Sequence, residues 1–132
     1  MGYCILLVDD SATTRGLIKR AIQLAGLPVT EFLEAGHGKE ALAQLQTHVV
    51  DLILTDLHMP EMNGIELARA VLANPATAPI TIAVISAEPN GQRLLELRRA
   101  GVKGYLRKPC TPEALRDLVV PLMENRHAPS IT

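Results

Sequence analysis

The chain has 132 residues, of which 48 % are apolar and 20 % charged, and its 13 basic and 14 acidic side chains give a net charge of −1. This length suits one domain with a real core, and the composition excludes a disordered protein. The balanced charge gives no basis for nonspecific binding to nucleic acids or membranes. Because aromatic residues make up only 2 % of the chain, the core must consist of Leu, Ile, Val and Ala, and a surface that stacks nucleobases is excluded.

The two cysteines, Cys4 and Cys110, lie far apart and have no metal-type spacing. The N-terminal apolar run, residues 4–8, is too short for a signal peptide or a membrane span. We therefore interpret both cysteines as free thiols in a reducing compartment and expect a cytoplasmic protein.

Five short apolar runs alternate with five amphipathic segments. The predicted strands cover residues 3–8, 28–35, 51–55, 80–85 and 102–106. The predicted helices lie between Ser11 and Gly26, over residues 39–46, between Gly64 and Asn74, over residues 90–100, and from Pro112 onward. Such alternation predicts an α/β domain, a parallel sheet with helices on both faces. The mixed pattern of residues 28–35 predicts an edge strand.

Two of the predicted helices allow more detailed expectations. The helix over residues 90–100 is expected to bury Leu94, Leu95 and Leu97. The last helix is expected to bury one face, made of Leu115, Leu118, Val119 and Leu122. Pro121 lies inside this helix and predicts a kink or an early end.

Polar side chains follow four of the predicted strands. Asp9 and Asp10 follow the first strand, Asp56 the third, Ser86 the fourth and Lys108 the fifth. Ligands of open α/β sheets bind beyond the carboxyl ends of the strands, near the point where the strand order reverses. We therefore expect these five residues to converge at one edge, provided that the first and third strands are neighbours.

The residue types at this edge suit phosphoryl transfer. Clustered carboxylates repel one another, and Mg²⁺ removes the conflict because it prefers carboxylate and phosphate oxygens. Lys108 and Ser86 offer a positive charge and a hydroxyl to phosphoryl oxygens, and a carboxylate can attack phosphorus to give an aspartyl-phosphate. The residues thus predict a magnesium site at which Asp56 accepts a phosphoryl group.

The stretches that carry these residues resemble the receiver domain of bacterial response regulators, of the single-domain chemotaxis type. The matching stretches are LVDDS (7–11), AGHGKEAL (35–42), LTDLHMPEMNG (54–64), VISA (84–87) and AGVKGYLRKP (100–109). The resemblance covers about residues 3–125. It implies a flavodoxin-like sheet of five parallel strands in the order 2-1-3-4-5 with five helices, a receiver domain over residues 1–126 and a flexible tail over residues 127–132.

The resemblance implies a role for each matched residue. Asp56 is the phosphoacceptor, and Asp9, Asp10 and Asp56 hold Mg²⁺ together with the backbone carbonyl of His58. The switch and phosphate contacts are Ser86, Tyr105 and Lys108. The side chains of His58 and Glu88 tune the rate of dephosphorylation.

The resemblance also implies the partners. A phosphohistidine on a sensor histidine kinase or a phosphotransfer protein is the phosphodonor, and the surface of the fourth helix, fifth strand and fifth helix then binds a downstream protein. Arg93, Arg98, Arg99 and Arg107 are either part of that surface or ordinary solvated charges. We expect a monomer or weak dimer without direct nucleic-acid or membrane binding. The resemblance implies a switch that catalyses only its own phosphorylation and dephosphorylation.

Three other interpretations stay open. The chain can be a receiver domain cut from a larger response regulator or hybrid kinase. A phosphatase of the haloacid-dehalogenase type also forms an aspartyl-phosphate, but its nucleophile lies in an Asp-x-Asp motif at the first strand, where Asp9 and Asp10 are adjacent. A receiver-like binding module that is never phosphorylated has no need of the complete set of acids, hydroxyl and lysine.

Cys110 stands where a bulky apolar residue is common in the family, and we interpret it as a small hydrophobe.

Overall fold

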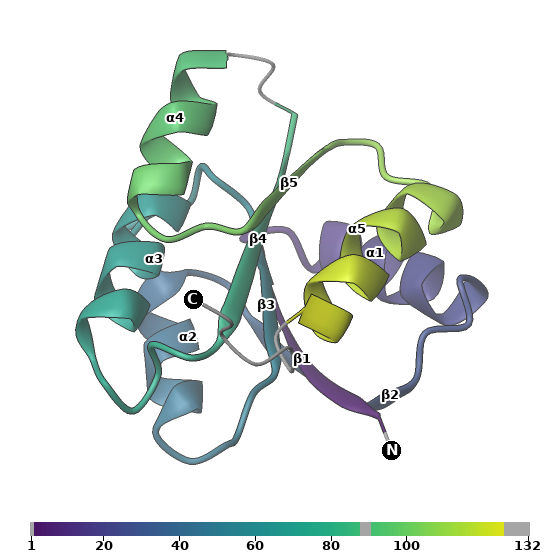
Figure 1. Cartoon of the computed structure of the whole chain (residues 1–132), viewed down its shortest axis with the longest axis horizontal. Helices are drawn as coiled ribbons and strands as arrows, with labels where there is room; N and C mark the ends of the chain where they lie inside the picture. The colour runs from purple at the N-terminus through teal and green to yellow at the C-terminus, as the bar shows by residue number, and fades with distance from the viewer. Residues whose placement is uncertain (1, 88–90, 126–132) are drawn as a thin grey trace.

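The computed structural model describes residues 2–87 and 91–125, and these residues form five strands and five helices that alternate along the chain (Figure 1). The strands are β1 (Tyr3–Val8), β2 (Val29–Ala35), β3 (Leu52–Thr55), β4 (Thr81–Ser86) and β5 (Gly104–Arg107). The helices are α1 (Ala12–Leu24), α2 (Gly38–Leu45), α3 (Gly64–Ala73), α4 (Gly91–Arg99) and α5 (Pro112–Asn125). Glu88 and the tail predicted for residues 127–132 lie outside the described part of the chain.

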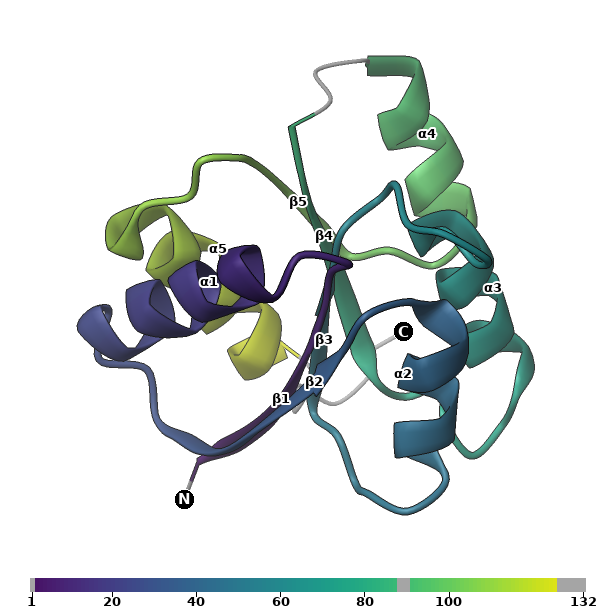
Figure 2. The ribbon, with the colours of Figure 1, turned by 180° about the vertical axis from the view of Figure 1, so that it is seen from behind.

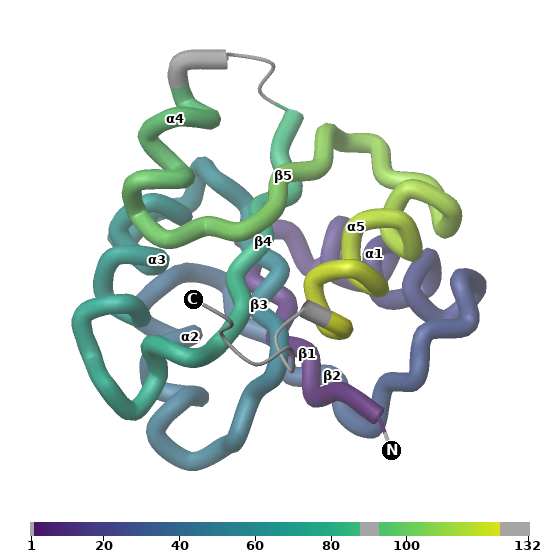
Figure 3. The backbone as a smooth tube through the Cα atoms, in the orientation of Figure 1, coloured from purple at the N-terminus to yellow at the C-terminus, as the bar shows by residue number. Residues whose placement is uncertain are grey.

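All strand pairs are parallel and follow the order β2-β1-β3-β4-β5, which confirms the predicted order and the edge position of β2. The chain runs from β1 outward to β2, returns to β3 on the other side of β1, and then adds β4 and β5 (Figure 3). One row of paired residues crosses the whole sheet near the carboxyl ends of the strands. From β2 to β5, its members are Ala35, Val8, Thr55, Val84 and Tyr105.

The helices form a layer on each face of the sheet. α1 and α5 pack side by side on one face, and α2, α3 and α4 cover the other (Figures 1 and 2). Alternate residues of β1 divide between two cores, with Leu6 in the core under α2, α3 and α4, and Ile5 in the core under α1 and α5. The central strands read as continuous apolar runs because both of their faces are buried.

Short polar signals set the ends of several helices. Ser11 caps α1 by accepting from the backbone N–H of Thr14 at 3.2 Å. Asn63 and Glu66 form a reciprocal capping box at the start of α3. Gly26 follows α1 with φ of +74°, a left-handed conformation that glycine adopts without a steric penalty.

The burial expected for α4 was wrong, and of the two outcomes expected at Pro121, a kink or an early end, the structure excludes the early end. In α4, Leu97 is buried, but Leu94 is 37 % and Leu95 54 % exposed, because only the side of the helix that carries Leu97 reaches the core. In α5, the helix continues through Pro121 to Asn125 instead of ending early. Proline removes only one backbone donor, and buried Val119 and Met123 on either side of it anchor the helix to the core.

Within residues 2–87 and 91–125, no helix is both long and apolar enough to cross a membrane.

Candidate functional site

The site lies just beyond the row of paired residues that crosses the sheet. Asp9 and Asp56 follow directly after Val8 and Thr55, which are paired neighbours on β1 and β3. The backbone N–H of Asp56 donates to the carbonyl of Val8 at 2.8 Å and so ties the two strand ends together. Because β1 and β3 are adjacent, their acids meet at one edge, as the sequence predicted.

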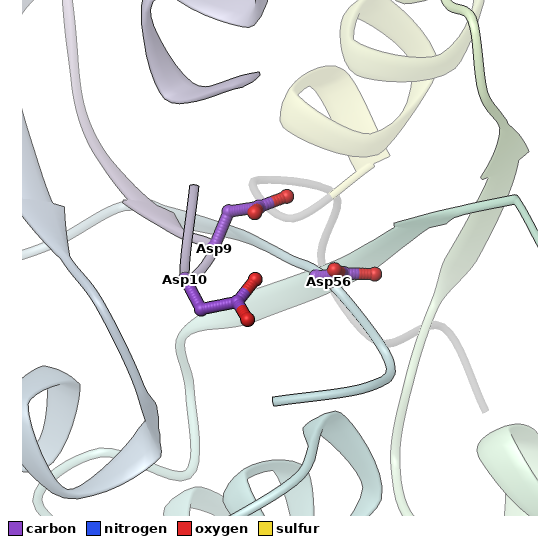
Figure 4. Close-up of side chains that lie close together, drawn as sticks. All are labelled: Asp9, Asp10 and Asp56. Atoms are coloured by element: carbon purple, nitrogen blue, oxygen red, sulfur yellow. The ribbon is translucent and has the colours of Figure 1, made fainter. Parts of the chain in front are cut away.

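Three carboxylates gather at this edge. Asp9, Asp10 and Asp56 each offer an oxygen, and these oxygens lie within 4.8 Å of one another (Figure 4). Asp9 is 3 % exposed, Asp56 is partly buried and Asp10 is exposed. The cluster therefore has a buried end at Asp9 and an end open to solvent at Asp10.

Backbone donors fix two of the three carboxylates. Oδ1 of Asp9 accepts from the N–H of Ser11 at 2.9 Å, and Oδ1 of Asp56 accepts from the N–H of Leu57 at 2.8 Å. Each bond uses one carboxylate oxygen and leaves the other directed elsewhere. The orientation of both acids is therefore set by the turns that directly follow their strands.

Lys108 brings a cation to the buried end of the cluster. Its Nζ lies 2.8 Å from Oδ2 of Asp9 and 3.4 Å from Oδ2 of Asp56. Its backbone N–H donates to the carbonyl of Ser86 at 2.9 Å, which ties the loop after β5 to the end of β4. The carboxylates and the ammonium come from parts of the chain separated by up to 99 residues.

These contacts shift two pKa values. Burial raises the pKa of Asp56 above its usual value, and the charge of Asp9 adds to this, while Lys108 opposes it without cancelling it. For Lys108, burial lowers the pKa, but the hydrogen bond to Asp9 and the charges of both acids outweigh burial and leave the pKa raised. Lys108 is therefore a permanent cation at physiological pH. Binding of a metal cation beside Lys108 would further favour the ionised form of Asp56.

The other predicted residues lie around this centre. Ser86 ends β4 and is buried, two rows beyond Val84, at the same edge as the acids. Tyr105 is partly buried on β5 and lines a pocket of about 300 Å³ beneath α4. His58 has an exposed side chain two residues after Asp56. The remaining predicted residue, Glu88, lies outside the described residues.

Both thiols are free, as predicted from their spacing. Burial raises the pKa of Cys110, which lies partly buried after Lys108 and Pro109, and burial also raises that of Cys4. A raised thiol pKa lowers the thiolate fraction and thus the reactivity. This favours the interpretation of Cys110 as a small hydrophobe over a redox role.

The sequence analysis missed two residues at the site, Arg15 and Gly64. Arg15 Nη1 donates to the main-chain carbonyl of Asp9, and its Nε donates to Oε1 of Glu34 at 2.8 Å. The sequence offers only a weak signal for this contact: a basic residue in the first turn of the helix that follows the two acids. Gly64 was interpreted only as part of a turn or helix start, whereas it also lies against the backbone of Asp56.

Replacement of Gly64 by alanine is expected to disturb the loop that follows Asp56. A Cβ at this position meets the carbonyl oxygen of Asp56 at 2.5 Å and Cα of Leu57 at 3.1 Å, both of them backbone atoms that cannot rotate away. We expect Gly64→Ala to lower the free energy of unfolding by about 1–3 kcal/mol in urea titrations. The matched control is Gly16→Ala in α1, where a Cβ meets nothing within 4 Å. The control is expected to stabilise the protein by roughly 0.5–1 kcal/mol, and an equal effect of the two changes would contradict the steric argument.

The donor set fits a hard dication. Mg²⁺ takes oxygen ligands in octahedral geometry and keeps several waters, so it needs few protein ligands and an open side. The cluster provides carboxylate oxygens from three residues and is open to solvent at Asp10. Lys108 balances only part of the negative charge of the three acids, so the cluster keeps a net negative charge that attracts a cation.

The fold and this arrangement of acids agree with a family comparison. Residues 5–120 match the family described as the response regulator receiver domain. The chain therefore belongs to the response regulator receiver domain family, the phosphoacceptor class of two-component signalling.

Similar proteins include chemotaxis regulators. The chemotaxis protein CheY of Pseudomonas aeruginosa is 36 % identical over 120 residues, which cover 91 % of this chain and 95 % of the relative. CheY1 of Helicobacter pylori strain J99 is 37 % identical over 114 residues, which cover 86 % and 90 %. Among solved structures, the chemotaxis regulator CheY4 of Vibrio cholerae matches with a TM-score of 0.79 at 30 % identity, over 96 % of this chain and 99 % of that chain.

Receiver domains of longer proteins match as well. The signal receiver domain of a histidine kinase from Syntrophus aciditrophicus has a TM-score of 0.80 at 26 % identity, over 99 % of this chain and 98 % of that chain. The same fold thus occurs in single-domain regulators and in a domain of a kinase.

Proposed function

We propose that this protein is a phosphorylation-operated switch in which Asp56 accepts a phosphoryl group from a phosphohistidine of a sensor kinase or phosphotransfer protein. The single observation that carries the proposal is the meeting of Asp9, Asp10, Asp56 and Lys108 at one edge of the sheet. Together they supply a nucleophile, a set of oxygen ligands and a fixed cation. We further propose that residues 1–126 act as one receiver unit.

Asp56 is positioned as the nucleophile. One of its oxygens accepts from the N–H of Leu57, so the carboxylate cannot rotate freely. An oxygen of Asp56 attacks phosphorus as the bond from phosphorus to the donor nitrogen breaks, and the bonding electrons return to the imidazole. Lys108, already 3.4 Å from Oδ2 of Asp56, then lies within reach of a phosphoryl oxygen and offsets its charge.

Mg²⁺ is the cofactor that suits this cluster, and Asp9, Asp10 and Asp56 would hold it together with the backbone carbonyl of His58. When bound, the ion supplies positive charge that offsets the charge of the phosphoryl oxygens. Asp9 holds its place through Ser11 and Lys108. Asp10, which is exposed, leaves that side of the cluster open to the donor.

The switch proceeds by a population shift between two arrangements. We propose that the phosphoryl group draws the hydroxyl of Ser86 toward it and that Tyr105 changes its position on β5. The backbone bond between Lys108 and Ser86 couples the two strand ends that take part. The side chains of His58 and Glu88 then tune the access of the attacking water and thereby the rate of dephosphorylation.

A downstream protein is proposed to bind the α4-β5-α5 surface. Tyr105 lines the pocket of about 300 Å³ at this surface together with Leu97, Arg98 and Lys103. Leu94 and Leu95 of α4 are exposed beside it, so apolar and basic groups lie together there. The names of the relatives suggest chemotaxis as the setting.

The position of the nucleophile disfavours the phosphatase alternative. In this chain the acids after β1 are adjacent, and the third acid follows β3. A haloacid-dehalogenase phosphatase places both catalytic acids in one motif after its first strand. The complete set of acids and lysine also disfavours a binding module without phosphorylation.

Incubation with Mg²⁺ and acetyl phosphate tests the proposal. We expect a mass gain of one phosphoryl group on Asp56, stable to acid and labile to base, as for an acyl phosphate. Asp56→Asn is expected to abolish the gain, and removal of Mg²⁺ with a chelator is expected to reduce it strongly. An unmodified wild-type protein, or equal labelling of Asp56→Asn, would overturn the function.

A further inference from the structure

Arg15 connects three elements beside the acidic cluster. It lies in the first turn of α1, and its side chain is only 17 % exposed. Its guanidinium donates from Nη1 to the main-chain carbonyl of Asp9 and from Nε to Oε1 of Glu34, a residue near the end of β2. One side chain thus joins the start of α1 to the ends of β1 and β2.

The carbonyl that Arg15 binds lies past the paired part of β1. Val8 is the last β1 residue paired with β2, and the N–H of Asp9 still donates to the carbonyl of Ala35 at 3.1 Å. The next main-chain acceptor, the carbonyl of Asp9, receives its donor from Arg15. Arg15 therefore extends the ordered part of β1 by one peptide unit, into the metal-binding loop.

This peptide unit joins two of the three clustered acids. A peptide unit is planar, so the oxygen of Asp9 and the N–H of Asp10 share one plane. A hydrogen bond that fixes this oxygen limits the rotation of both residues. The directions of the Asp9 and Asp10 side chains relative to each other then depend on that bond.

We infer that Arg15, anchored by Glu34, is a positioning residue that holds the Asp9–Asp10 peptide unit in the orientation needed to bind Mg²⁺. The inference rests on the proposed function, because it concerns the same metal site. A guanidinium suits the task because its rigid fork serves two acceptors at fixed angles, which a lysine ammonium does not. Glu34 neutralises the guanidinium. The pair of Arg15 and Glu34, called the brace below, therefore places no uncompensated positive charge next to a site that must attract Mg²⁺.

A purely structural role predicts a different result from a positioning role. If Arg15 only stabilises the fold, its loss lowers the free energy of unfolding and leaves the magnesium affinity of the folded protein unchanged. If Arg15 positions the acids, the affinity falls in a protein that remains folded. The dissociation constant for Mg²⁺, measured by calorimetry below the unfolding transition, separates the two.

The experiment compares Arg15→Gln, Arg15→Lys and Glu34→Ala with wild type. We expect Arg15→Gln to weaken Mg²⁺ binding about tenfold, as for the loss of other groups that orient a metal ligand. Arg15→Lys is also expected to weaken binding despite its charge, and Glu34→Ala by a smaller factor. Since Glu34 acts through Arg15, the double variant is expected to bind no more weakly than Arg15→Gln. At saturating Mg²⁺, labelling of Asp56 by acetyl phosphate is expected to approach the wild-type rate.

Arg20→Ala is the matched control, because Arg20 is an exposed arginine on the same helix. It removes the same charge and is expected to leave the dissociation constant unchanged. Equal magnesium affinity of wild type and folded Arg15→Gln overturns the inference and leaves the proposed function intact. Should Arg15→Gln not fold, Glu34→Ala decides: weaker binding supports the brace, and unchanged binding overturns it. A wild-type protein that binds no Mg²⁺ overturns both.

Discussion

Replacement of Lys108 by methionine is expected to destabilise the magnesium-free protein and to slow the phosphorylation of Asp56. Lys108 is the ammonium that contacts both Asp9 and Asp56, and Asp9 is 3 % exposed. Loss of one partner of a buried ion pair leaves the other charge uncompensated. We expect a decrease of about 2–3 kcal/mol in the free energy of unfolding at pH 7, less than for a fully buried pair because Lys108 is 23 % exposed. The phosphorylation rate is expected to fall about 100-fold.

The pH dependence of this loss follows from Asp56. Its pKa is already raised by burial, and without Lys108 the pKa in the folded protein rises further above that of the unfolded chain. The part of the destabilisation that arises from Asp56 is then complete above the folded-state pKa and disappears as the pH falls below the unfolded-state value of about 4. Urea titrations of wild type and Lys108→Met between neutral and acidic pH measure this convergence. Added Mg²⁺ is expected to restore part of the lost stability at pH 7.

Lys39→Met is the matched control for this change. Lys39 is 64 % exposed and lies 3.9 Å from Glu61, an exposed pair of the kind that contributes little. The control is expected to show neither the loss of stability nor the magnesium rescue. A loss in Lys108→Met that is independent of both pH and Mg²⁺ would count against the electrostatic account and favour lost packing.

Replacement of Asp10 by asparagine is expected to separate metal affinity from stability. Asp10 is the exposed member of the cluster, so its side chain contributes nothing to core packing. Its charge repels the carboxylates of Asp9 and Asp56. We expect Asp10→Asn to weaken Mg²⁺ binding by about 10- to 100-fold, measured by calorimetry. In the absence of Mg²⁺ it is expected to leave the free energy of unfolding unchanged or slightly raised, because one repulsive charge is gone.

Asp117→Asn controls for the change in net charge. Asp117 is exposed on α5, outside the cluster, and undergoes the same chemical change. Its magnesium affinity is expected to equal that of wild type. If both variants bind Mg²⁺ as wild type does, the dication does not bind at the cluster. If Asp10→Asn unfolds more easily than wild type, the carboxylate has a structural role that its exposure does not suggest.

The helix signals of this sequence acted locally and were therefore predictable. Ser11, Asn63 and Thr111 cap the starts of α1, α3 and α5 with their own side chains. The buried stripe of α5 follows from helical spacing, whereas the burial of α4 did not. Leu94 and Leu95 have the same side chain as Leu97, and only the narrow contact of α4 with the rest of the fold distinguishes them.

The acids at the strand ends were predictable because parallel strands share a direction. An acid that ends a buried strand must lie at the carboxyl edge of the sheet, which Asp9 and Asp56 do. The contact of Arg15 with the carbonyl of Asp9 was not predictable in this way, because it depends on the angle at which α1 leaves the sheet. The close approach of Gly64 to the backbone of Asp56 likewise depends on the path of a loop.

The sequence by itself determined that this protein is one α/β domain whose strands end in acids, a hydroxyl and a lysine, since apolar runs and capping residues act over a few positions. Only the tertiary structure decided that Lys108 lies 2.8 Å from Asp9 and that Arg15 contacts both the carbonyl of Asp9 and Glu34. Such contacts join segments up to 99 residues apart. Their distances depend on sheet twist and helix packing, which arise from the sum of many small contacts and leave no mark at any single position.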